Sequence, residues 1–133
     1  KDYDFIVENP KRVLHFPGWS ERRSRFGCPK FSQNETEIDF VPLKQVYSIV
    51  VRKLPPTIDN YLSGVPWNIQ HFIYDPNNKT LNGKHGVISL ETKTLEIYNL
   101  EMSKHAAIFY NSTVDAMAKK KAEELGFRYI PPS

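Results

Sequence analysis

Two short segments of the chain constrain its fold most, because both alternate charged and apolar residues with the period of a β-strand. Residues 2–7 read Asp-Tyr-Asp-Phe-Ile-Val, and residues 37–43 read Glu-Ile-Asp-Phe-Val-Pro-Leu. Successive side chains on a strand point to opposite faces, so the aspartates of each segment lie opposite its aromatic residues. If the two strands are neighbours, the carboxylates of Asp2, Asp4 and Asp39 meet on one patch of a sheet.

A patch of three carboxylates is suited to hold magnesium, which prefers hard oxygen ligands and usually also binds the phosphates of a substrate. Asp2, Asp4 and Asp39 are therefore candidate metal ligands. The alternative is that these aspartates are solvated or cap the ends of their strands. Two acidic strands do not decide between the two interpretations.

Composition sets modest bounds. The chain has 133 residues, which predicts one domain over residues 1–133 with a core that needs no disulfide. Cys28 is the only cysteine, so a disulfide framework and a zinc cluster are excluded. No apolar run approaches the roughly 20 residues of a membrane span. With no visible signal peptide, we expect a cytoplasmic protein without a membrane partner. The net charge of +3 is too small to argue for a polyanionic partner.

Local patterns predict a chain of mixed helices and strands, and residues 9–30 are expected to be irregular. A hairpin is expected from strands at 30–32 and 36–41, and residues 43–51 are expected to form a short helix followed by a strand. Further expected elements are a helix at 58–63, a mixed strand at 67–75, short strands at 87–88 and 95–98, a helix at 114–125 and an extended tail at 127–130. The fold class is therefore α+β, with a mixed sheet flanked by helices.

The helix over residues 114–125 has the clearest pattern. Its apolar residues recur at helical spacing, and Gly126 follows as a terminating residue. We expect one face of this helix to pack against the sheet and Lys119 and Lys120 to be exposed. The residues expected on the packed face are Val114, Met117, Ala122 and Leu125.

Five motifs follow one another in an order that resembles one family. They are Lys-Asp-Tyr-Asp-Phe-Ile-Val, Glu-Ile-Asp-Phe-Val-Pro-Leu, Leu-Pro-Pro-Thr-Ile-Asp-Asn-Tyr-Leu, Pro-Trp-Asn-Ile-Gln-His-Phe-Ile-Tyr-Asp and Ala-Glu-Glu-Leu-Gly-Phe. Together they resemble the head domain of the poly(A) polymerase and CCA-adding class of nucleotidyltransferases, over residues 1–130. The resemblance implies a polymerase-β-like fold in which two magnesium ions are held by paired carboxylates, matched by Asp2 and Asp4, and by a third, matched by Asp39.

The resemblance also points to nucleotide-binding residues. Where CCA-adding enzymes carry two arginines and an aspartate, this chain has residues 64–66, Gly-Val-Pro, but Asn68 and Gln70 keep polar groups beyond them. Arg25 and its neighbours Arg22 and Arg23 are the candidate cations for the phosphates, and the alternative is that they belong to a solvated loop. The family's Gly-Ser turn is expected upstream of Asp2, so the domain is expected to be incomplete at its N-terminus.

The implied activity is magnesium-dependent transfer of a nucleoside monophosphate from a nucleoside triphosphate to a hydroxyl of RNA, a small molecule or a protein. Asp2 and Asp4 would bridge the metals, and Asp39 would hold the metal at the acceptor hydroxyl or take its proton. The alternative is a catalytically silent module of the same fold that binds nucleotide, nucleic acid or a protein. The missing arginine pair favours the silent module. The three retained aspartates favour the enzyme, because clustered carboxylates repel one another.

Overall fold

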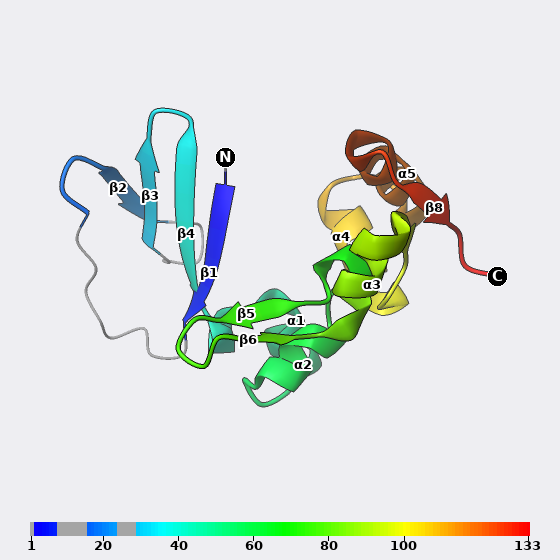
Figure 1. The fold of residues 1–133 in the computed structure, drawn as a ribbon, viewed down its shortest axis with the longest axis horizontal. Helices are drawn as coiled ribbons and strands as arrows, with labels where there is room; N and C mark the ends of the chain where they lie inside the picture. Colours follow the sequence, from blue (N-terminus) through cyan, green and yellow to red (C-terminus); the bar gives the residue numbers. More distant parts are fainter. Residues whose placement is uncertain (1, 8–15, 24–28) are drawn as a thin grey trace. The chain divides into compact units, whose positions relative to one another are not determined.

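The computed structural model describes residues 2–7, 16–23 and 29–133, and only the backbone of residues 2 and 3. The chain forms two compact units, Lys1–Thr57 and Ile58–Ser133, and each is described by itself (Figure 1). Both strands and helices are present, as the predicted α+β class requires. No helix in the described ranges is both long enough and apolar enough to cross a membrane.

A four-stranded mixed sheet forms most of the first unit. Its strands are β1 (Asp2–Val7), β2 (Ser20–Arg23), β3 (Pro29–Gln33) and β4 (Thr36–Pro42), in the order β1-β4-β3-β2. β1 runs parallel to β4, and the other neighbours are antiparallel. The predicted hairpin is confirmed, and its turn places Asn34 at a φ of 54°, a left-handed conformation that asparagine tolerates well. The prediction that residues 9–30 are irregular is wrong at β2, which forms a strand although its residues are all exposed and show no apolar alternation.

Aromatic rings cover one face of this sheet. The rings of Phe31 and Phe40 lie 5.8 Å apart, and Phe16 lies 4.7 Å from Phe31. Phe5 stacks on Phe40 at 5.4 Å across the β1–β4 pair. Phe31 is 1% exposed and forms the centre of this face. The opposite face is therefore left to the charged residues of the same strands.

The segment after β4 differs from the prediction. It forms a 3₁₀ turn, η1 (Leu43–Gln45), and a helix, α1 (Tyr47–Arg52), in place of a helix and a strand. The helix buries Ile49, and the Arg52 Nε donates to the Ser48 carbonyl at 2.8 Å. Lys53 ends it in the left-handed conformation. β-branched residues in this stretch gave a strand signal that the helical packing overrides.

The second unit contains five helical segments and two small sheets. In chain order its elements are α2 (Ile58–Ser63), η2 (Asn68–Gln70), β5 (Ile73–Asp75), β6 (Thr80–Asn82), α3 (Lys84–Thr92), β7 (Thr94–Glu96), α4 (Leu100–Phe109), α5 (Val114–Leu125) and β8 (Arg128–Ile130). β5 pairs antiparallel with β6, and β7 pairs parallel with β8. The predicted helix at 58–63, the strand at 95–98 and the tail strand at 127–130 are confirmed within a few residues.

Two strand predictions in this unit are wrong. Residues 67–75 begin with the 3₁₀ turn η2 and form a strand only from Ile73, so Asn68 and Gln70 do not share a strand face. Residues 87–88 lie inside helix α3. Helix α4 was not predicted, although Asn99 caps it by accepting the Met102 N–H at 2.9 Å.

Helix α5 packs on the central core of the unit, which consists of Leu95, Ala118 and Ala122. Thr113 caps the start of the helix by accepting the Ala116 N–H at 3.1 Å. Gly126 ends the helix in the left-handed conformation, as predicted. Lys119 and Lys120 are exposed, also as predicted. The expected burial of Leu125 is wrong, because this side chain is 46% exposed. The small alanines on the facing side let the helix approach β7 closely.

Helix α3 begins against the backbone of His71. The Gly86 N–H donates to the His71 carbonyl at 2.9 Å, and a Cβ on Gly86 would lie 2.8 Å from that oxygen. The buried His71 ring contacts the rings of His85 and Tyr98, at centroid distances of 4.7 and 4.5 Å. Its Nδ1 finds no hydrogen-bond partner among the described residues. Burial, and then the neighbouring His85, lower the pKa of His71.

Candidate functional site

The parallel pairing of β1 with β4 brings the predicted carboxylates to one region. The register sets Asp4 opposite Asp39 and Asp2 opposite Glu37. Neighbouring strands lie about 4.8 Å apart, and residues directly opposite each other present their side chains to the same face. Asp4 and Asp39 therefore share the face opposite the aromatic rings. Of Asp2 the structure gives the strand position only.

Two cations lie on the same charged face. The Lys30 Nζ lies 3.7 Å from Asp39 Oδ1 and 3.6 Å from Glu37 Oε2. The Arg22 Nη2 donates to Glu37 Oε1 at 3.0 Å. Lys30 and Asp39 are each 25% exposed, so this ion pair is less screened by solvent than one at the open surface. A metal ion at Asp39 would share this carboxylate with the ammonium of Lys30 or compete with it.

The carboxylate oxygens on this face are the type of ligand that magnesium prefers. Asp4 and Asp39 offer hard carboxylate oxygens from adjacent strands. Among the side chains that the structure describes, no group of three histidine, cysteine or acidic residues forms a metal site. The third ligand predicted from sequence, Asp2, would have to complete the set. Its assignment as a ligand stays a prediction, as do those of Asp4 and Asp39.

The three predicted nucleotide-binding residues lie in different settings. Arg25 falls outside the described ranges. Asn68 is 5% exposed, and its amide joins η2 to β7: Nδ2 donates to the Thr94 carbonyl at 3.2 Å, and Oδ1 accepts the Glu96 N–H at 2.8 Å. Gln70 is exposed, and its Oε1 accepts the backbone N–H of Trp67 at 3.1 Å. Of the two amides, only that of Gln70 is available at the surface.

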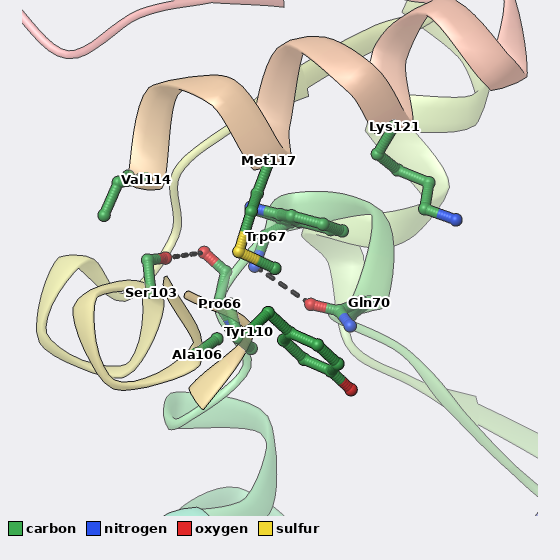
Figure 2. Close-up of a pocket in the computed structure, with 9 residues that line it drawn as sticks. All are labelled: Pro66, Trp67, Gln70, Ser103, Ala106, Tyr110, Val114, Met117 and Lys121. Carbon is green, nitrogen blue, oxygen red and sulfur yellow. Dashed lines mark hydrogen bonds between the residues drawn. The ribbon is translucent and has the colours of Figure 1, made fainter. Parts of the chain in front are cut away.

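Gln70 lines a pocket within the second unit, formed by η2, α4 and α5 (Figure 2). The cavity has a volume of about 330 Å³. Figure 2 shows Met117 reaching down from α5 beside the Trp67 ring, with Tyr110 and Gln70 below it. Lys121 extends from α5 at one end of the pocket. The pocket thus combines two aromatic rings, a thioether, an amide and an ammonium group.

The backbone that carries this pocket is held by side chains. The Ser103 hydroxyl lies in hydrogen-bond distance of the Pro66 and Asn99 carbonyls, at 3.0 and 2.9 Å, which ties α4 to the start of η2. Tyr110 ends α4, and its N–H donates to the Ala106 carbonyl at 3.0 Å. The rings of Trp67 and Tyr110 are therefore attached to backbone that hydrogen bonds hold in place, although the Tyr110 side chain is 66% exposed.

Sequence reasoning missed Lys30 and the pocket residues Tyr110 and Lys121. Lys30 could have been found, because the predicted hairpin register places it opposite Asp39. Trp67 packs against the core cluster of this unit and also lines the pocket. Tyr110 and Lys121 come from separate helices, so no sequence spacing indicates that they meet Trp67.

Comparison with known proteins places the fold. No family model and no curated protein matches the sequence. Two solved structures are similar: a tRNA-processing enzyme in an apo form, at 15% identity and a TM-score of 0.67, and a tRNA-processing enzyme with CTP, at 14% identity and a TM-score of 0.59. The matches cover 97% and 85% of this chain but 34% and 29% of the other chains, so the chain spans about one third of their length. At these identities the likeness shows the fold alone. It confirms the predicted α+β class, which the matched part of each tRNA-processing enzyme shares.

Proposed function

We propose that the chain is part of a magnesium-dependent nucleotidyltransferase that moves a nucleoside monophosphate from a nucleoside triphosphate to an acceptor hydroxyl. The observation that carries this proposal is the parallel β1–β4 register, which sets Asp4 opposite Asp39 on the charged face of the sheet. The likeness in fold to a tRNA-processing enzyme with CTP supports a nucleoside triphosphate as substrate and RNA as one acceptor. A small molecule and a protein hydroxyl are the other acceptors to test, and a cytoplasmic location stays a prediction.

In the proposed reaction the acceptor oxygen forms a bond to the α-phosphorus while the bond to the pyrophosphate oxygen breaks. Asp2, Asp4 and Asp39 would hold magnesium, which neutralises charge on the phosphoryl oxygens and lowers the pKa of the acceptor hydroxyl when bound. Asp39 would either hold the metal at the acceptor hydroxyl or itself take the acceptor proton. Lys30, within 4 Å of Asp39 and Glu37, is a cation on this face that would stabilise negative charge on phosphoryl oxygens bound beside Asp39.

The test compares Asp39→Asn with Glu37→Gln in the full-length protein. Both changes remove one carboxylate from the same face, but only Asp39 lies opposite Asp4. Transfer is measured with labelled nucleoside triphosphates and a panel of RNA and protein acceptors, and magnesium binding by thermal melting with and without the metal. We expect Asp39→Asn to abolish transfer, and Glu37→Gln to retain most of it. Without metal, Asp39→Asn should change the free energy of unfolding by less than about 1 kcal/mol, because its ion pair with Lys30 is long and partly exposed.

One observation favours the silent alternative, a module of this fold that binds without catalysis. Lys30 already neutralises Asp39, which is an arrangement that stabilises a fold without any metal. Equal transfer by the wild type and Asp39→Asn would contradict the catalytic assignment. No transfer by either protein, with no magnesium-dependent stabilisation of the wild type, would favour the silent module.

A further inference from the structure

One row of charged residues crosses all four strands of the sheet in the first unit, which Figure 1 shows in the order β2-β3-β4-β1. The register sets Arg22 opposite Lys30, and Lys30 opposite Asp39. It also sets Asp39 opposite Asp4. Residues directly opposite one another present their side chains to the same face. The row therefore consists of two cations followed by two carboxylates, and only the step from Lys30 to Asp39 joins opposite charges.

This order of charges is unfavourable for a sheet that binds no ion. Like charges directly opposite each other on neighbouring strands are destabilising, whereas an alternating row would give each charge an opposite neighbour. Lys30 offsets the repulsion between Asp4 and Asp39, because its Nζ lies 3.7 Å from Asp39 Oδ1. In the protein without a divalent ion, the ammonium of Lys30 thus supplies the positive charge that a metal ion would bring to Asp39.

The ammonium of Lys30 is shared between two carboxylates. Its Nζ lies 3.6 Å from Glu37 Oε2 and 3.7 Å from Asp39 Oδ1. Both distances are longer than the roughly 2.7–2.9 Å of a charge-assisted hydrogen bond. Lysine carries its charge on a flexible four-carbon stem, so the ammonium can move between neighbouring anions. If Asp39 binds a metal ion, Lys30 still has Glu37 as a partner and does not become an unpaired charge.

We propose that Lys30 is a built-in counter-ion of the metal site. It neutralises Asp39 in the metal-free protein, competes with magnesium for this carboxylate, and so determines the magnesium concentration at which the site fills. The inference rests on the proposed function, because it takes Asp4 and Asp39 as metal ligands. Lys30 acts through Asp39 and is therefore a positioning residue. When Asp39 holds magnesium, the ammonium is released to pair with phosphoryl oxygens, so metal binding and phosphate binding are coupled.

The test measures the binding of magnesium chloride alone, without nucleotide, to the full-length protein by isothermal titration calorimetry. Lys30→Met removes the charge but keeps an unbranched apolar side chain. Lys30 and Asp39 are each 25% exposed, so solvent screens the repulsion between the ammonium and a metal ion only in part. We therefore expect Lys30→Met to bind magnesium about 5-fold to 50-fold more tightly than the wild type.

Two control variants separate this effect from a general change in charge. Lys44→Met removes an exposed lysine of η1 in the same unit, so it changes the net charge by the same amount. It should leave the magnesium affinity unchanged in about 0.15 M salt, where the screening length is about 8 Å. Lys30→Arg keeps the positive charge and should not tighten magnesium binding. In the Asp39→Asn background, Lys30→Met should also fail to tighten it, because the shared carboxylate is gone.

Thermal melting gives a second readout, which a purely structural lysine would not change. Without metal, Lys30→Met should melt at a lower temperature than the wild type, because the repulsion between Asp4 and Asp39 is no longer offset. Added magnesium should raise the melting temperature of Lys30→Met more than that of the wild type, since stabilisation by a ligand grows with its affinity. A lysine that only stabilises the sheet would leave the increase caused by magnesium the same in both proteins.

The inference is overturned if Lys30→Met binds magnesium no more tightly than the wild type, or if Lys44→Met tightens binding as much. Absence of magnesium binding in both the wild type and Lys30→Met would also overturn it. The transfer assay is a separate measurement. Asp39-dependent transfer with equal magnesium affinity of the wild type and Lys30→Met would refute only the counter-ion. Tighter binding by Lys30→Met in a protein that transfers no nucleotide would refute only the proposed activity.

Discussion

Truncating Asn68 tests whether its amide holds the second unit together or is available to a ligand. Asn68→Ala removes two hydrogen bonds and leaves the Thr94 carbonyl and the Glu96 N–H without their partner. Each buried polar group that loses its partner costs about 1–3 kcal/mol. Thr94 is buried, whereas Glu96 is exposed and water can reach its N–H more easily. The cost of leaving the Glu96 N–H without a partner therefore lies at the low end of this range. We therefore expect a loss of about 2–4 kcal/mol in the free energy of unfolding.

Urea denaturation measures this loss as a shift in the transition midpoint at constant slope. Asn82→Ala is the matched control, because Asn82 is exposed at the end of β6 and should change stability by less than about 0.5 kcal/mol. Asn68→Asp should also destabilise, since a carboxylate oxygen would face the Thr94 carbonyl in place of the amide donor. A stability change below about 0.5 kcal/mol for Asn68→Ala, together with weaker nucleotide binding, would refute the structural role and restore the sequence-based assignment.

Two further predictions follow from burial. His71 is 8% exposed and its pKa lies below 6.5 in the folded protein, so the unfolded state binds more protons once the pH falls below that value. The contribution of this residue to thermal stability should therefore be constant above about pH 6.5 and should decrease below that pH. Thermal melting between pH 7.5 and 5 should show a smaller decrease in melting temperature for His71→Phe than for the wild type. An equal decrease in both proteins would contradict the assignment. Leu95→Ala should cost about 2–5 kcal/mol because Leu95 is fully buried, whereas Leu125→Ala should cost less than about 1 kcal/mol because Leu125 is 46% exposed. Chemical denaturation of the two variants side by side decides this, and similar losses would show that α5 is rotated from the face described.

Sequence patterns predicted those elements whose signals are local. The hairpin between β3 and β4 follows from alternation and a turn, and α5 follows from helical spacing that ends at Gly126. The strand β1 and its partner β4 were also predicted, and the structure adds that they are neighbours and parallel.

Two wrong strand predictions have a physical explanation in the structure. Residues 67–73 alternate like a strand, but two side-chain contacts stabilise a 3₁₀ turn there: the Gln70 Oε1 accepts the backbone N–H of Trp67, and Asn68 reaches 26 residues ahead to the Thr94 carbonyl. Val87 and Ile88 favour a strand by propensity, yet α3 forms there and packs closely on the His71 backbone. The pocket could not be predicted either, since its residues come from three elements.

The topology of the first sheet also determines the order in which its parts can assemble. β2, β3 and β4 pair antiparallel with near neighbours in the chain, whereas Asp4 and Asp39 are separated by 35 positions and pair in parallel. Closing the longer loop costs more chain entropy, so non-local pairing forms more slowly than a hairpin. We expect the β3–β4 hairpin to form first and β1 to dock afterwards as the edge strand. The juxtaposition of the two carboxylates would then arise in the last step of sheet formation, after the hairpin that carries Lys30 and Asp39 is already in place.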